Sequence, residues 1–176
     1  MMPDFNVCTR ERAARFAPGD AKTFQRHKQE SRSAKRESKP CRVVGVMETA
    51  LYVEELERSA RFYQDVFDFA TLYKNARCWA LSVADQQVLL LFKKGESLLP
   101  VATPGGIIPP SEGSGHLHLA FAVEHDELEQ WEQKLDEHNV KVESKVNWKR
   151  GGASLYFRDH DQHLIELVTR GCWSIY

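Results

Sequence analysis

The feature that most constrains the fold is an internal repeat. Residues 48–54 (ETALYVE) resemble residues 118–124 (HLAFAVE), 70 positions later, and residues 85–92 (DQQVLLLF) resemble residues 161–168 (DQHLIELV), 76 positions later. One such match could be a chance likeness between apolar strands. Two matches in the same order, with compatible offsets, indicate a duplicated module with a small insertion in the second copy.

The repeat also predicts the order of elements in each module: a strand, a helix and three further strands. In the first module we expect them at 43–53, 55–67, 69–73, 78–83 and 87–92, and in the second at 116–123, 126–138, 140–146, 154–158 and 164–168. Asp126 with Glu129 is a capping-box-like start for the second helix, and Asn139 suits a left-handed end. The expected buried stripes of the two helices are Leu56, Ala60, Tyr63, Phe67 and Leu128, Trp131, Leu135.

The strand that opens the second module carries a histidine face. Because strand side chains alternate, one face is apolar and suits packing under a helix (Leu117, Leu119, Phe121, Val123), while the other has two histidines and two small residues (His116, His118, Ala120, Ala122). Histidine is the commonest side-chain metal ligand, although strand histidines are more often structural than ligating. The repeat aligns His118 with Glu48, and Glu166 with Leu90.

The chain divides by charge into a basic tail and an acidic body. Residues 1–42 carry 11 Lys and Arg against 5 Asp and Glu, so the remaining 134 of the 176 residues carry 13 against 20. We expect 1–42 to be a disordered tail, either merely solvated or an arm for nucleic acid or an acidic partner. The acidic body, one domain over 43–170, argues against nucleic-acid binding.

The cysteines and the hydropathy predict a cytoplasmic protein. Cys8, Cys41, Cys78 and Cys172 are scattered without a C-x-x-C pair, as expected of reduced thiols. The longest apolar run is far too short to span a membrane, and the N-terminus lacks the apolar core of a secretory signal.

Two loops have open interpretations. Residues 95–114 join module 1 (about 43–94) to module 2 (about 115–170), and their Pro and Gly residues predict no regular structure. This long connection is either a lid or binding loop, or a plain linker. The basic turn 149–152 could hold an anionic group through Arg150, although a solvated turn is the commoner outcome.

These segments resemble the vicinal oxygen chelate superfamily of glyoxalases, bleomycin resistance proteins and extradiol dioxygenases. The matching residues are 48–53, 56–59 and 62–63 for the opening of one module and 118–121, 156–159 and 164–167 for the second. The resemblance covers about 43–169. It implies an α+β fold in which two tandem βαβββ modules form an open, cup-shaped mixed sheet around a metal.

The resemblance places metal ligands at Glu48, His118 and Glu166, with Glu48 and Glu166 also catalytic. The last strand supports Glu166 independently, because a carboxylate among apolar neighbours is costly to bury without a partner or a metal. Four-ligand members have an acidic residue where Leu90 stands, so a three-ligand site is expected here. Asp68 and Gln162 stand where Gly is common in the family.

The ligand set predicts a divalent ion with open coordination positions. Carboxylates favour Mn, Fe(II) or Mg, and the imidazole also suits Zn or Ni. Such an ion can chelate neighbouring oxygens of a small-molecule substrate. Further residues expected to face that substrate are His116, Tyr52, Tyr156, Arg158 and Arg150. The sequence leaves open whether the site lies within one chain or is shared in a homodimer.

Three functions remain open at this point. The first is a metal-dependent lyase, isomerase or dioxygenase acting on a small oxygenated substrate. The second is an antibiotic resistance protein that transfers a thiol to a drug or sequesters it. The third is a metal-free ligand-binding module, since one scaffold carries many chemistries.

Overall fold

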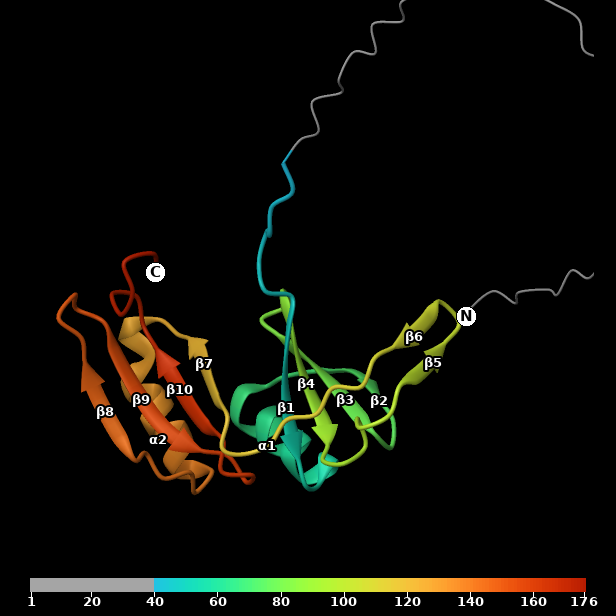
Figure 1. Ribbon diagram of the computed structural model, residues 1–176. Coiled ribbons are helices and arrows are strands. Elements are labelled where there is room, and N and C mark those ends of the chain that lie inside the picture. The colour runs from blue at the N-terminus through green and yellow to red at the C-terminus, as the bar shows by residue number, and fades with distance from the viewer. Residues whose placement is uncertain (1–39) are drawn as a thin grey trace, which may run out of the picture. The chain divides into compact units, whose positions relative to one another are not determined.

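The computed structural model describes residues 40–176, and residues 43–176 form one structural unit (Figure 1). The predicted disordered tail therefore lies almost wholly outside the described residues. No helix among the described residues is long and apolar enough to cross a membrane.

Each module builds its own four-stranded sheet. Module 1 contains β1 (Glu48–Val53), α1 (Leu56–Phe67), β2 (Thr71–Lys74), β3 (Cys78–Val83) and β4 (Gln87–Lys93), in the sheet order β1-β4-β3-β2. Module 2 contains β7 (His118–Ala122), a short 3₁₀ helix (His125–Glu127), α2 (Leu128–Glu137), β8 (Ser144–Asn147), β9 (Ala153–Arg158) and β10 (Leu164–Val168), in the order β7-β10-β9-β8. In both sheets the first strand is an edge strand and runs parallel to the last.

The strand registers confirm the repeat. Ala50 lies opposite Leu90 in sheet 1, and Ala120 lies opposite Glu166 in sheet 2, as the offsets of 70 and 76 residues require. The predicted α+β fold with two βαβββ modules is confirmed.

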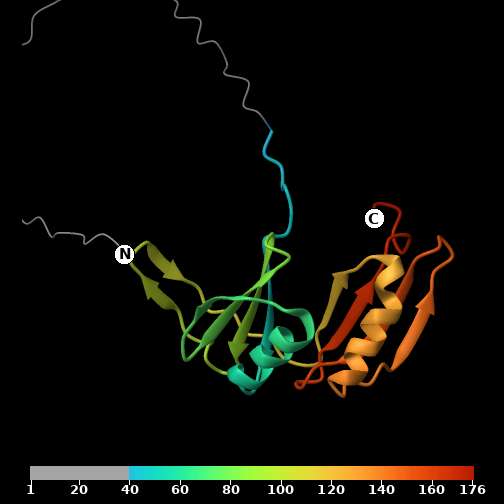
Figure 2. The ribbon, with the colours of Figure 1, turned by 180° about the vertical axis from the view of Figure 1, so that it is seen from behind.

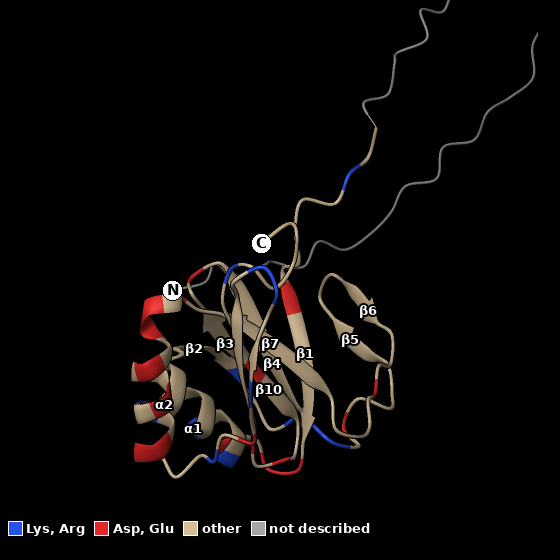
Figure 3. Ribbon diagram, turned by 90° about the vertical axis from the view of Figure 1, so that its left-hand side faces the viewer, with Lys and Arg blue, Asp and Glu red and all other residues tan. Residues whose placement is uncertain are grey.

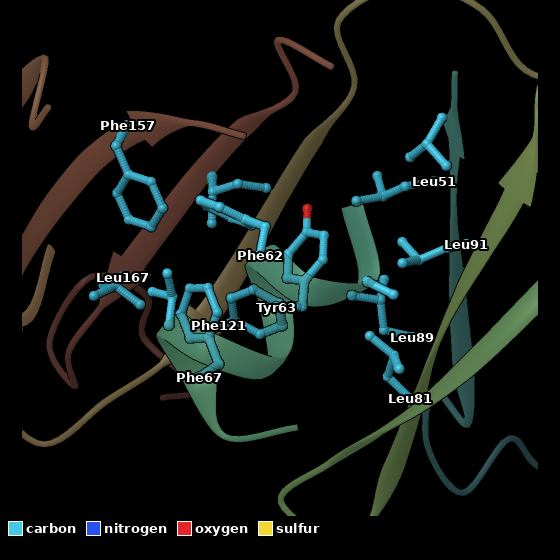
Figure 4. Close-up of a cluster of buried hydrophobic side chains, with 14 of the residues drawn as sticks. Leu51, Phe62, Tyr63, Phe67, Leu81, Leu89, Leu91, Phe121, Phe157 and Leu167 are labelled. Atoms are coloured by element: carbon cyan, nitrogen blue, oxygen red, sulfur yellow. The ribbon is translucent and has the colours of Figure 1, made fainter. Parts of the chain in front are cut away.

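Helix α1 lies between the two sheets and joins their cores (Figures 1 and 2). Its predicted stripe is buried, and Tyr63 and Phe67 reach the second module, where Phe67 packs on Phe121 at 5.0 Å and on Phe157 at 6.3 Å between ring centroids. Figure 4 shows Tyr63 and Phe67 of α1 between the leucines of sheet 1 and the side chains of sheet 2, which include Phe121 and Phe157. Each fully buried large side chain contributes about 1.5–3 kcal/mol, so this shared core holds the two modules together.

A buried polar network reinforces the same contact. Asp161, in the turn between β9 and β10, accepts hydrogen bonds from the Glu54 backbone N–H (2.7 Å) and from Ser59 Oγ (2.7 Å). Asp159 accepts a hydrogen bond from Tyr63 Oη (2.8 Å). The turn of module 2 is thereby fixed to the start of α1 in module 1.

Helix α2 packs through Leu135, which is fully buried, with Leu128 and Trp131 partly buried, as the predicted stripe requires. Acidic residues recur at intervals along this helix (Figure 3). The predicted capping box is wrong: a 3₁₀ turn precedes α2, and no side chain caps it. Asn139 does adopt a left-handed conformation, with φ of 57°.

Several predicted boundaries and one predicted loop are also wrong. β1 begins at Glu48 instead of 43, and β8 begins at Ser144 instead of 140. The pairing with the neighbouring strand starts only at these two residues. The connection 95–114 is not irregular throughout. It holds a hairpin of β5 (Val101–Thr103) and β6 (Gly106–Ile108), since its Pro-Gly pair forms a tight turn between two short runs.

Candidate functional site

Sheet 2 brings His118 and Glu166 together on its open face. His118 opens β7 and Glu166 lies in the middle of β10, with His118 Nε2 3.2 Å from Glu166 Oε2. The Glu166 side chain is 8% exposed and the His118 side chain 49%. A nearly buried carboxylate thus faces an imidazole that solvent can reach.

A second contact orients the imidazole of His118. Its Nδ1 lies 3.1 Å from the carbonyl oxygen of Leu164, which can only accept a hydrogen bond, so Nδ1 carries the proton. In the neutral ring, Nε2 is then an acceptor and faces a second acceptor, Oε2 of Glu166. This arrangement needs either a proton, on Nε2 or on Oε2, or a metal ion between the two atoms. A ring nitrogen fixed by a backbone carbonyl is also typical of ligating histidines.

Two hydroxyl groups hold the other carboxylate oxygen. Glu166 Oε1 accepts hydrogen bonds from Ser154 Oγ (2.5 Å) and Tyr156 Oη (2.9 Å). Burial, and then the bond to Glu166, raise the pKa of Tyr156, so its hydroxyl stays protonated and donates at neutral pH. The sequence reasoning placed Tyr156 on this face but missed Ser154, although Ser154 has the same parity two residues earlier on β9.

The C-terminal segment adds a cysteine that the sequence reasoning also missed. Partial burial, and then the nearby Glu166 charge, raise the pKa of the Cys172 thiol. The segment is held against β9 by close backbone packing, because a Cβ on Gly152 would lie 2.6 Å from the Cys172 nitrogen. No periodicity in the sequence could have indicated this contact.

Glu48 lies on the other sheet. It is exposed at the start of β1 and lines a pocket of about 450 Å³ on the open face of sheet 1, together with Tyr52 and Leu90. No group of three His, Cys, Asp or Glu residues that could hold a metal occurs within residues 40–176. One chain therefore joins His118 to Glu166 but does not bring Glu48 to them, and a three-ligand site within a single chain is not what the structure shows.

The remaining predicted residues fall in different places. Arg158 bonds to Glu143 (3.4 Å) and to the Gln162 carbonyl (3.0 Å) and is not among the partners of Glu166. His116 and Arg150 are exposed, and no side-chain hydrogen bond of either occurs in the described part of the chain. Leu90 shares the open face with Glu48, which confirms the predicted register.

His163 is fully buried and faces away from this site, as predicted from strand parity. Its Nδ1 lies 2.8 Å from Asp159 Oδ2. Burial opposes ionisation of Asp159, but the contacts with His163 and the Tyr63 hydroxyl outweigh it and lower the pKa of that carboxyl group.

Comparison with known proteins agrees with the fold. Residues 45–167 match the family described as the glyoxalase/bleomycin resistance protein/dioxygenase superfamily. The chain belongs to this superfamily. The resemblance noted in the sequence is thereby confirmed.

Among curated members of the superfamily, the chain is similar to thiol transferases. It is 28% identical over 119 residues to metallothiol transferase FosB of Staphylococcus saprophyticus, a match that covers 66% of this chain and 71% of the relative. It is 30% identical over 121 residues to glutathione transferase FosA of Serratia marcescens, covering 66% and 74%.

Solved structures of the superfamily show the same fold. Lactoylglutathione lyase from Agrobacterium tumefaciens has a TM-score of 0.69 and 28% identity, covering 75% of this chain and 98% of that one. The fosfomycin resistance protein FosX of Listeria monocytogenes, solved in complex with Mn(II) and sulfate, has a TM-score of 0.56 and 21% identity, covering 73% and 91%. The latter likeness shows the fold alone.

Proposed function

We propose that this protein is a divalent-metal-dependent enzyme in which His118 and Glu166 of one copy and Glu48 of a second copy hold the ion. The observation that carries this proposal is the pair of acceptor atoms, His118 Nε2 and Glu166 Oε2, that face each other at 3.2 Å. A nitrogen and a carboxylate oxygen are suitable ligands for Mn, Fe, Zn or Ni. The second carboxylate oxygen is occupied by two hydroxyl groups, which leaves Oε2 for the ion.

A second copy is needed because Glu48 lies on sheet 1, whereas His118 and Glu166 lie on sheet 2. Glu48 occupies the position equivalent to His118 in the repeat, yet α1 keeps the two sheets of one chain apart (Figure 2). Large apolar side chains precede Glu48 and are exposed to solvent; Val44, for example, is 92% exposed. A second copy docked at this edge would bury them and would bring Glu48 to the first copy's His118 and Glu166.

The reaction proposed first is transfer of a thiol to a small electrophilic, oxygenated molecule. Two of the relatives above are named as thiol transferases, and a curated FosX relative from Listeria innocua, 22% identical over 132 residues, is named for fosfomycin resistance. A bound divalent ion would act as a Lewis acid on the substrate oxygens. The chain's own groups orient the site: the Leu164 carbonyl fixes His118, and Tyr156 and Ser154 fix Glu166.

A lyase or isomerase acting on a thiol adduct is the second candidate. The likeness to lactoylglutathione lyase favours it, because that structure is 28% identical and is covered over 98% of its length. Leu90, on the open face where a fourth acidic ligand would stand, argues against a shell of the glyoxalase type. Both candidates share a thiol-containing substrate.

Elemental analysis of protein purified without chelators tests the metal. We expect about one divalent ion per chain, and loss of that ion in His118→Ala but not in the matched control His116→Ala. Thiol consumption with fosfomycin, in the presence of Mn(II), then tests the reaction. Metal-free protein whose thermal midpoint does not respond to added Mn(II) would contradict the proposal and favour a metal-free binding module.

A further inference from the structure

The pocket beside Glu48 has a buried hydroxyl group that no contact within the described chain explains. Residues that line it include Tyr52, Arg77, Ser97 and Ser111, with Leu90, Phe92 and Ile108 as apolar walls. Ser97 is 3% exposed, and its Oγ finds no hydrogen-bond partner among residues 40–176. A buried hydroxyl without a partner costs about 1–3 kcal/mol, so it is expected to serve a ligand.

Arg77 supplies a positive charge at the same place. It is partly buried, its guanidinium lies 5.8 Å from the centre of the Phe92 ring, and no ion pair of the described residues involves it. This long cation–π contact favours the position of the guanidinium and leaves its N–H groups free to bind a carboxylate or phosphonate.

The hydroxyl groups of Tyr52 and Ser111 complete the donor set. Tyr52 Oη lies 3.3 Å from Ser111 Oγ, a long bond that leaves one hydroxyl proton free to turn towards a ligand. The segment that carries Ser111 is fixed in two ways. Ser111 N–H donates to the Ser97 carbonyl at 3.0 Å, and a Cβ on Gly113 would lie 2.6 Å from the Tyr52 ring, so the chain lies directly on that ring.

We infer that this pocket binds an anionic group, a carboxylate or phosphonate, through Arg77, Ser97 and Ser111. Tyr52 follows Glu48 by four residues on β1, so its backbone lies about 13 Å along the strand from that of Glu48. A ligand that reached from this end of the pocket to Glu48 would be elongated, with an apolar middle against Leu90. The link between the anion site and the reacting end at Glu48 rests on the proposed function, whereas the anion site itself does not.

Two probes distinguish the sources of such an anion. Glutathione carries carboxylates on an extended thiol co-substrate, and inorganic phosphate represents a compact substrate anion. In calorimetric titrations of the full chain we expect at least one to bind, about tenfold or more weaker in Arg77→Gln because a charge-assisted hydrogen bond is lost. Ser97→Ala should weaken binding severalfold. The matched control is Arg61→Gln, since Arg61 is exposed on α1 and already pairs with Glu57.

Competition between the probes assigns the anion. If phosphate displaces glutathione, both use the same donors; if only glutathione binds, the anion belongs to the thiol co-substrate. Mn(II) affinity should be the same in Arg77→Gln and the wild type, so a failure of the metal proposal is seen separately. Equal affinity of Arg77→Gln and Arg61→Gln, or no binding of either probe to the wild type at millimolar concentration, would overturn the inference.

Discussion

The two modules have the same backbone plan and different open faces. At an offset of 76 residues, module 2 has Ser154, Tyr156 and Glu166 where module 1 has Cys78, Ala80 and Leu90, and the registers place Tyr156 opposite Glu166 and Ala80 opposite Leu90. Module 2 therefore carries a buried carboxylate with its hydrogen-bond donors. Module 1 has apolar or small side chains at all three equivalent positions.

This difference indicates that the open faces of the two sheets have different roles. A buried carboxylate is tolerated only with its partners, so Glu166 depends on the hydrogen bonds from Ser154 and Tyr156. In module 1 the pocket on the open face is lined by one carboxylate, that of Glu48. We interpret module 2 as the half that supplies two of the metal ligands, and module 1 as the half that supplies the third ligand, Glu48, and the substrate pocket.

The largest expected effect comes from the pair of equivalent residues Glu166 and Leu90. Glu166→Gln removes a charged ligand and should weaken Mn(II) binding by 100-fold or more, measured by equilibrium dialysis. Leu90→Gln, the same side chain at the equivalent position of module 1, should leave the affinity within about twofold, because Leu90 has no role in holding the ion. Equal losses in the two variants would show that the faces are not specialised.

The turns before the last strands give a second test. Asp161→Asn removes a buried charge that accepts hydrogen bonds from Glu54 and Ser59 and should lower the free energy of unfolding by about 2 kcal/mol. Its counterpart Asp85 is exposed and bonds only Ser82 Oγ at 3.2 Å, so Asp85→Asn should change stability by less than about 0.5 kcal/mol. Urea unfolding measures both, and a reversed order would contradict the role given to the Asp161 turn.

The lowered pKa of Asp159 predicts an acid-dependent contribution to stability. Its folded pKa lies below the unfolded value of about 3.9, so ionised Asp159 stabilises the fold above that value. This contribution is lost as the pH falls through the folded pKa. Asp159→Asn should therefore show a smaller loss of stability than the wild type between pH 5 and acid unfolding, each variant compared with its own value at pH 7. The control is Asp65→Asn, which removes a carboxylate on the exposed face of α1.

The smallest expected effect concerns backbone strain at Gln162. This residue has φ of 67°, a left-handed conformation that glycine adopts without cost. Gln162→Gly should raise stability by about 0.5 kcal/mol, because relief of strain slightly exceeds the added entropy of the unfolded chain. Gln86→Gly, at the equivalent position without positive φ, should give no gain. Thermal unfolding of the two variants decides the point.

Much of the fold could be predicted from the sequence because the repeat fixed both the elements and their registers. Strand parity alone placed Tyr156 with Glu166 and kept His163 away from it. Parity says which face of a sheet a residue lies on, but not which sheets meet, so the separation of Glu48 from His118 within one chain needed the structure. The contact of Cys172 depends on the close approach of Gly152 and Gly171, which leaves no pattern in the sequence.

Complementation between two variants that are each impaired in Mn(II) binding tests the central claim, that the metal site is shared between copies. Glu48→Gln and Glu166→Gln should each bind Mn(II) weakly alone. When the two are produced together with different affinity tags and the mixed dimers are isolated, one of the two sites in each dimer combines intact Glu48 with intact His118 and Glu166. We predict one tightly bound Mn(II) per mixed dimer. Mixed dimers that bind no better than the parent variants, or Glu48→Gln alone with wild-type affinity, would contradict the account.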